Sequence, residues 1–382
     1  MTVIADAVPS RIRFDRNELA GAFGDIGTDL PLIAGMILAA GLDAAGVLIL
    51  FGVMQWLTAV RYGIPMPVQP LKAMAVIVIT QQIAGPVLYG AGLAIGATML
   101  LLAATGALSW LARVIPKAVV RGLQLGLGLQ LALLALREYI PAAGSPGLLL
   151  AAAGFILTLL LLGNRRFPPA LLVIGLGGVH AFAYDVDAAQ LAAGAGFTLP
   201  MIQIPTREAI VTGFVLLALP QIPLSLGNSL LATRQIASDL FPTRPVSVRQ
   251  LGFTYAAMNL VSPWFGGVPV CHGSGGLAGH YTFGARTGGS LVIYGSLYVV
   301  AGLFFAGTFA TLVRVFPLPI LGVLLLFEAV ALILLVRDQV ARRGDLTVAV
   351  TVALMAALLP YGYVIAMIAG TALWYGMARR DS

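Results

Sequence analysis

Long apolar runs fill this chain, and short clusters of basic residues separate them. Of the 382 residues, 59% are hydrophobic and only 10% are charged. Soluble domains carry about 25% charged residues, so this composition excludes a soluble fold. A helix that crosses a bilayer needs about 20 apolar residues, and a shorter run serves where a helix crosses only half of it. The sequence therefore predicts an all-α polytopic membrane protein.

Apolar windows of this length predict fourteen spans, seven in each half of the chain. The predicted spans are residues 19–40, 44–60, 67–82, 86–110, 115–136, 147–163, 169–186, 208–233, 248–264, 270–285, 289–313, 318–336, 346–359 and 361–378.

The basic residues predict the orientation of these spans. With the N-terminus inside, eighteen Lys and Arg residues fall on the cytoplasmic side, and three, Arg137, Arg207 and Arg314, fall outside. This bias follows the positive-inside rule and predicts a multi-pass protein of the cell membrane with both termini cytoplasmic. The net charge of +7 does not indicate nucleic-acid binding, because the basic residues form no stripe with interleaved aromatics. We expect no cleavable signal peptide and no soluble domain after the last span.

Two segments rich in Pro and Gly interrupt the apolar runs, one in each half. They are residues 63–72 (GIPMPVQPLK) and 266–276 (GGVPVCHGSGG). A broken helix at membrane depth is tolerated only where it is buried in protein or lines a polar cavity. The two segments therefore predict half-helices in spans 3 and 10 around a central site. Pro70 is expected to start the first half-helix, which runs through Lys72 toward Thr80.

The two halves are predicted to be inverted repeats, at residues 1–190 and 205–382. Seven is an odd number, so the halves insert with opposite orientations. Two short echoes fall in corresponding spans: residues 67–70 (PVQP) resemble 269–272 (PVCH), and residues 29–32 (DLPL) resemble 221–224 (QIPL). Residues 187–206 are expected to connect the halves.

Two opposed helix N-termini concentrate partial positive charge, which predicts a site for an anion. Lys72 strengthens this interpretation, because an ammonium group inside a span needs a specific partner. The candidates are an anionic substrate and two aspartates of span 1, Asp25 and Asp29. A structural ion pair with one aspartate and a role in substrate binding both remain open.

Polar residues in three other spans are candidates for function. Asp25 and Asp29 are four residues apart, on one predicted helical face with Thr28 beside them, and either serve coupling and gating or brace helix packing. Span 8 carries a polar stripe that lines a cavity or joins helices: Gln221, Ser225, Asn228 and Ser229. His272 either contacts the substrate, changes protonation during coupling, or has a structural packing role. Glu328 is expected to lie away from both breaks and to be structural or interfacial.

Three motifs carry a resemblance to a known family: residues 23–28 (FGDIGT), 67–72 (PVQPLK) and 271–288 (CHGSGGLAGHYTFGARTG). The chain resembles the molybdate transporter family, distant relatives of the sulfate permeases. The resemblance implies molybdate uptake and a seven-plus-seven inverted-repeat fold. It also implies a core domain, residues 15–112 and 207–313, and a gate domain, residues 113–200 and 314–380.

The chain is therefore predicted to be a secondary active transporter of a tetrahedral oxyanion, with molybdate favoured over sulfate or tungstate. The predicted substrate-binding residues are Thr28, Gln69, Lys72, Gln221, Ser225, His272, Gly273, Ser274, Gly275 and Gly276. The alternatives are a permease for another small anion or a nucleobase, and an anion channel. An enzyme is not expected, because Ser274 and His272 lack a third partner. No cofactor or metal is expected. Both a coupling proton and a homodimer stay open. The chain has a single cysteine, Cys271, which excludes an intramolecular disulfide.

Overall fold

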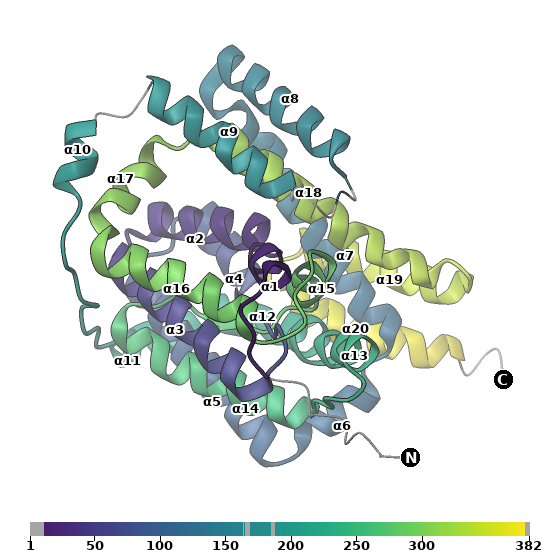
Figure 1. Cartoon of the computed structure of the whole chain (residues 1–382). Coiled ribbons are helices and arrows are strands. Elements are labelled where there is room, and N and C mark those ends of the chain that lie inside the picture. The colour runs from purple at the N-terminus through teal and green to yellow at the C-terminus, as the bar shows by residue number, and fades with distance from the viewer. Residues whose placement is uncertain (1–10, 163, 165–168, 185–187, 379–382) are drawn as a thin grey trace, which may run out of the picture.

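A computed structural model describes residues 11–162, 164, 169–184 and 188–378, and this part of the chain is almost entirely helical (Figure 1). The helices of the first half are α1 (Arg16–Ala22), α2 (Ile26–Ala40), α3 (Ala44–Tyr62), α4 (Lys72–Gln81), α5 (Gly85–Ala104), α6 (Ala107–Val114), α7 (Lys117–Leu134), η1 (Ala135–Tyr139), η2 (Ile140–Ala143), α8 (Gly144–Leu160), α9 (Pro169–Tyr184) and α10 (Ala188–Ala193). The strand β1 (Gln69–Pro70) precedes α4.

The second half begins with one long helical stretch in five parts. These are α11 (Arg207–Gly213), η3 (Phe214–Ala218), α12 (Leu219–Leu224), η4 (Ser225–Ala232) and α13 (Thr233–Leu240), of which η3 and η4 are π-helical. The elements that follow are α14 (Val248–Val261), η5 (Ser262–Phe265), β2 (Val270–Cys271), α15 (Ser274–Thr282), α16 (Gly289–Phe304), α17 (Ala306–Val315), α18 (Leu318–Leu334), η6 (Leu335–Gln339), α19 (Arg343–Leu358) and α20 (Gly362–Ala378).

The described residues contain six helices that are long and apolar enough to cross a membrane. The number rises to seven if α16 and α17, which meet at an angle of 100°, are taken as one span. The structure thus agrees with the prediction, made from composition, of a helical membrane protein. The fourteen-span topology stays a prediction.

The first predicted span is broken into α1 and α2 by the turn at residues 23–25. At Gly24, an added Cβ would lie 2.6 Å from the Cα of His280, so the chain crosses α15 at a point where no side chain fits. Asp25 consequently lies at the N-cap of α2 instead of inside a helix. The predicted placement of Asp25 and Asp29 on one helical face is kept, because the Asp29 N–H donates to the Asp25 carbonyl over 3.1 Å.

The two proline-rich segments meet as an antiparallel strand pair. Gln69 lies opposite Cys271 and Pro70 opposite Val270, and the Leu71 N–H donates to the carbonyl oxygen of Pro269 over 3.1 Å. Pro70 is therefore extended, and α4 begins two residues later. The prediction that Pro70 starts the helix was wrong, because Pro70 belongs to β1 and pairs with Val270 of β2.

A buried amide side chain binds the backbone of each proline-rich segment. Gln55 of α3 donates to the Val68 carbonyl over 2.8 Å and accepts from the Val68 N–H over 3.1 Å. Asn259 of α14 binds Val270 in the same two-bond manner, at 2.7 and 2.9 Å. These amides satisfy backbone groups that no helix satisfies, as burial requires.

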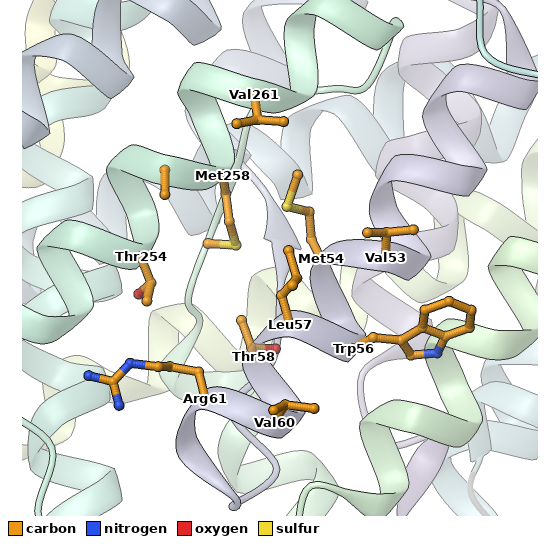
Figure 2. Close-up of a pocket in the computed structure, with 11 residues that line it drawn as sticks. Val53, Met54, Trp56, Leu57, Thr58, Val60, Arg61, Thr254, Met258 and Val261 are labelled. Carbon is orange, nitrogen blue, oxygen red and sulfur yellow. The ribbon is translucent and has the colours of Figure 1, made fainter.

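The helices that carry these amides, α3 and α14, border a cavity of about 520 Å³ (Figure 2). Its lining is mostly apolar, with Met54, Met258 and Val261 among the side chains that face it. Arg61 lies at one end. A cavity with so few polar groups is a poor binding site for an oxyanion, because it supplies few hydrogen-bond donors.

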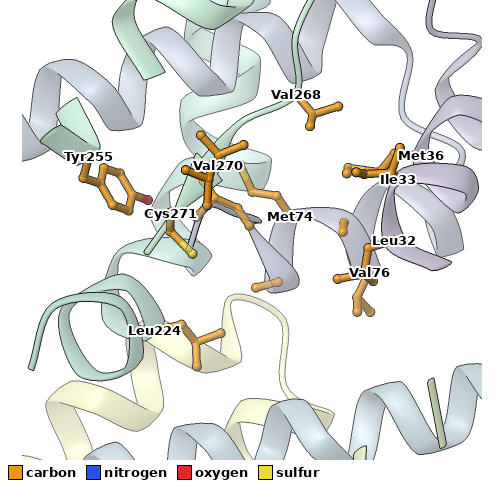
Figure 3. Close-up of a cluster of buried hydrophobic side chains, with 14 of the residues drawn as sticks. Leu32, Ile33, Met36, Met74, Val76, Leu224, Tyr255, Val268, Val270 and Cys271 are labelled. Atoms are coloured by element: carbon orange, nitrogen blue, oxygen red, sulfur yellow. The ribbon is translucent and has the colours of Figure 1, made fainter. Parts of the chain in front are cut away.

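The centre of the protein is a tightly packed apolar cluster around the strand pair (Figure 3). Met74 of α4 lies between Val270 of β2 and the α2 side chains Leu32 and Met36, and all four are almost fully buried. This packing places the N-terminal ends of α4 and α15 inside the protein, near the middle of the molecule (Figure 1).

The amide of Gln55 gives a direct test of this arrangement. Gln55→Ala leaves the Val68 N–H and carbonyl buried without partners, and we expect a loss of about 1–3 kcal/mol for each unsatisfied group. Thermal unfolding of the purified protein in detergent measures the loss. The matched control is Gln235→Ala, which removes an exposed amide, and an equal effect of both changes would contradict the role of Gln55.

Candidate functional site

The N-termini of α4 and α15 follow the paired strands directly, so both helices begin at the centre of the protein. The two ends differ in their hydrogen bonds. Gln221 accepts from the backbone N–H groups of Ala73 and Met74, over 3.0 and 3.2 Å, and so caps α4. No side chain of the described residues caps α15, whose backbone bonds start with Leu277 N–H to Gly273. The N-terminal N–H groups of α15 are thus the ones open to an anion.

Glycines bring polar side chains close to the start of α15. An added Cβ at Gly273 would collide with Gln69 Oε1, and one at Gly276 would collide with Asp25 Oδ2. Gln69 Nε2 in turn donates to both carboxylate oxygens of Asp25, over 2.7 and 2.6 Å. Gly275 is different, since among the described residues no heavy atom beyond its chain neighbours and the α15 backbone lies within 4 Å of the position that its Cβ would take.

Lys72, the first residue of α4, forms an ion pair with Glu328 of α18. Its side chain is 6% exposed and that of Glu328 is 17% exposed. Thr28 of α2 donates to the second carboxylate oxygen of Glu328 over 2.9 Å. The expectation that Glu328 lies away from the site was wrong, because α18 packs against α2 and brings residue 328 to the start of α4.

The two aspartates considered as partners of Lys72 have other hydrogen-bond partners. Asp25 binds Gln69, and Asp29 accepts from the hydroxyl of Tyr294 over 3.0 Å. Both carboxylates are buried. Each nevertheless acts electrostatically on Lys72 and Glu328, so the four charged groups form one cluster, which we call the charge cluster: Asp25, Asp29, Lys72 and Glu328.

The polar stripe predicted in span 8 lies at the same place. Besides capping α4, Gln221 donates to Ser225 over 3.1 Å, and the Ser225 hydroxyl bonds to the hydroxyl of Tyr255 over 2.8 Å. Asn228 accepts from the hydroxyl of Ser274, the first residue of α15, over 3.1 Å. One stripe thus contacts both helix ends. Its residues lie in α12 and the π-helical η4, next to Pro220 and Pro223, which lack the N–H for a regular helix bond.

His272 is bound to the scaffold through both ring nitrogens. Nε2 is 2.7 Å from the hydroxyl of Thr254, and Nδ1 is 3.2 Å from the carbonyl oxygen of Pro67. The ring of Tyr62 meets its ring edge-on at 5.6 Å. Of the three roles left open by the sequence, these contacts favour structural packing.

A second cavity, of about 320 Å³, reaches the charge cluster at Glu328 and Thr28. Its lining comes from the start of α2 and the turn before it, from α8, α9 and α18, and from the residues just after α8 and α15. The residues are Phe23, Gly24, Gly27, Thr28, Thr158, Leu162, Pro169, Ala170, Phe283, Leu324, Phe327, Glu328 and Ala331. Leu162 and Phe283 belong to span ends that we predict to be cytoplasmic, so this cavity lies on the predicted cytoplasmic side.

Comparison with known proteins identifies the family. A family model described as "Molybdate transporter of MFS superfamily" matches residues 17–131 and 213–332, more than half of the chain. The chain belongs to the molybdate transporter family. The resemblance expected from the sequence motifs is thereby confirmed, and the matched ranges include every residue of the charge cluster.

Curated molybdate transporters resemble the chain over most of its length. Molybdate transporter 2 of Arabidopsis thaliana is 35% identical over 369 residues, which cover 85% of this chain and 79% of the relative. Molybdate transporter 1 of the same plant is 33% identical over 86% of this chain and 81% of its own. These relatives are transporters, in agreement with the prediction that the chain is not an enzyme.

Solved structures with the same fold are sulfate-permease-like transporters. The transmembrane domain of the cyanobacterial bicarbonate transporter BicA matches with a TM-score of 0.62 at 19% identity, over 91% of this chain and 99% of that one. Murine solute carrier 26 family member A9, an anion transporter solved in the inward-facing state, matches with a TM-score of 0.66 at 13% identity, over 97% and 70%. The chain of this molybdate transporter family member therefore has a membrane transporter fold related to that of the sulfate permeases.

The buried Lys72–Glu328 pair is testable by a double-mutant cycle with Lys72→Met and Glu328→Gln. Removing one partner leaves an uncompensated charge, and we expect each single change to cost about 3–5 kcal/mol. The double change should cost much less than the sum. The control cycle uses the exposed pair Arg13 and Asp15, 3.9 Å apart, where we expect a coupling of about 0–1 kcal/mol. Unfolding in detergent measures all variants, and additive losses at Lys72 and Glu328 would contradict the pairing.

Proposed function

We propose that the chain carries molybdate across the membrane by alternating access, with the substrate held between the N-termini of α4 and α15. The observation that carries the proposal is the uncapped N-terminus of α15 at the centre of the protein, beside a buried lysine. The family and the named relatives favour molybdate over other oxyanions.

The chemistry of the site suits a tetrahedral dianion. Oxyanions accept hydrogen bonds from backbone N–H groups at a helix N-terminus, and Gly275 leaves space for one there. Lys72 supplies a full positive charge. The Ser274 hydroxyl already donates to Asn228, so Ser274 contributes its backbone N–H. These groups form our proposed substrate site together with Gln69, Gly273 and Gly276, while Thr28, Gln221 and Ser225 support it.

The two carboxylates closest to these groups stand in the place of a substrate oxyanion. Asp25 lies against the start of α15, and Glu328 holds the ammonium of Lys72. A carboxylate at a helix N-terminus is stabilised by the same partial charge that attracts an oxyanion. A substrate oxyanion that binds here must therefore displace these carboxylates from their present positions.

We also propose the inverted-repeat organisation, with α4 and α15 as half-helices, α1–α6 and α11–α17 as the core domain, and α7–α10 and α18–α20 as the gate domain. The matched binding of Gln55 to Val68 and of Asn259 to Val270 supports the repeat, because the two halves use one device at equivalent positions. The location in the cell membrane and the cytoplasmic termini stay predictions from the basic residues.

Calorimetric titration of the detergent-solubilised protein with molybdate, sulfate and uracil tests the proposed substrate. We expect molybdate to bind and uracil not to bind. Gly275→Ala places a methyl group in the open space, and we expect molybdate affinity to fall about tenfold, equivalent to about 1.4 kcal/mol, with unfolding temperature unchanged.

The control for this change is Gly175→Ala in α9, where an added Cβ also meets open space. It should bind molybdate like the unaltered chain. Uracil binding without molybdate binding would refute the substrate. Unchanged affinity in Gly275→Ala would refute the placement of the site at α15.

A further inference from the structure

The charge cluster holds more negative than positive groups. One ammonium, Lys72, lies among the three carboxyl groups of Asp25, Asp29 and Glu328. Glu328 already pairs with the Lys72 ammonium, so a dianion that binds at Lys72 must displace the Glu328 carboxylate.

Glu328 is the carboxyl group best placed to change. Both oxygens of Asp25 accept hydrogen bonds from Gln69, and Asp29 is fully buried against Tyr294. Glu328 instead borders the cavity of about 320 Å³, where water has access to it, and Thr28 holds one of its oxygens. It is also the group that occupies the Lys72 ammonium.

Among the described residues, the only ion pair of Glu328 is the one with Lys72. Among the described residues of the elements packed against α18, Lys117 and Arg121 of α7 bind Asp338, at the C-terminal end of this helical stretch. Arg137 and Glu138 are exposed in η1. His180 lies about three turns along α9 from Pro169, which lines the cavity.

We propose that Glu328 is the displacement and coupling group of the transporter, an inference that rests on the proposed function. When molybdate binds, its oxygens replace the Glu328 carboxylate at Lys72, and Glu328 takes up one proton from water in the cavity to form a neutral carboxyl group. Lys72 stays protonated throughout. When the substrate leaves, Glu328 releases this proton and pairs with Lys72 again.

The same exchange connects binding to movement. Lys72 begins α4 in the predicted core domain, and Glu328 lies in α18 of the predicted gate domain. Their ion pair ties the two domains together without substrate. Substrate binding breaks this tie, which allows the core to move against the gate.

Molybdate titrations at several pH values test the proposal on the unaltered chain and on Glu328→Gln. Repeating each titration in buffers of different ionisation enthalpy counts the protons taken up. The unaltered chain should take up about one proton per molybdate, so its affinity should fall as pH rises, by up to about tenfold per pH unit. Glu328→Gln keeps a hydrogen-bonding group for Thr28 but cannot ionise. It should take up no proton, show no pH dependence and bind at least about tenfold more tightly at alkaline pH.

The control is Glu138→Gln, a change of the same chemistry at an exposed glutamate, which should behave like the unaltered chain. If the unaltered chain does not bind molybdate, the proposed function fails and this inference fails with it. If it binds and Glu328→Gln shows the same proton uptake and pH profile, only the role of Glu328 is refuted.

A second variant covers the case in which Glu328→Gln does not fold. Thr28→Val keeps the ion pair and removes the hydrogen bond to the Glu328 carboxylate. Loss of that bond weakens the ionised form, so the pH profile of molybdate binding should shift to higher pH. An unchanged profile in this variant refutes the proposal.

Discussion

The need to satisfy backbone N–H and carbonyl groups in an apolar interior determines the structure at the centre of this protein. The proline-rich segments before α4 and α15 cannot satisfy their N–H and carbonyl groups within a helix. They satisfy them by pairing with one another and with the amides of Gln55 and Asn259. This arrangement brings two helix starts together in the protein interior, and it positions Gln69, Lys72 and Ser274.

The starts of α4 and α15 both follow a paired strand, but their first N–H groups have different partners. Gln221 satisfies the first N–H groups of α4, whereas α15 begins with glycines and without a side-chain cap. The sequence echo between residues 29–32 and 221–224 places Asp29 where the other half has Gln221, and Asp29 binds Tyr294 instead of a helix end. A symmetric scaffold thus supports an asymmetric site, with its open donors at α15 and its cation at α4.

Local chemistry explains which features the sequence predicted. Pro and Gly act within a few residues, so the breaks and the short helices after them were visible in the sequence. The pairing of Lys72 with Glu328 was not, because 256 residues separate them and only the packing of α18 on α2 brings them together. A signal was present, since a single acidic residue in the apolar run of α18 requires a partner of opposite charge. The turn at Gly24 and the scaffold contacts of His272 likewise depend on tertiary contacts.

The strand β2 also carries the sole cysteine of the chain, Cys271, which is almost fully buried beside Val270. A thiol in this position is shielded from water-soluble reagents by the apolar cluster around the strand pair. Cysteines introduced one at a time, for example at Ala331 on the cavity wall, would therefore be the reactive thiols of the protein. Because Cys271 is buried, thiol labelling of such single-cysteine variants would report the side of the membrane from which the cavity is accessible.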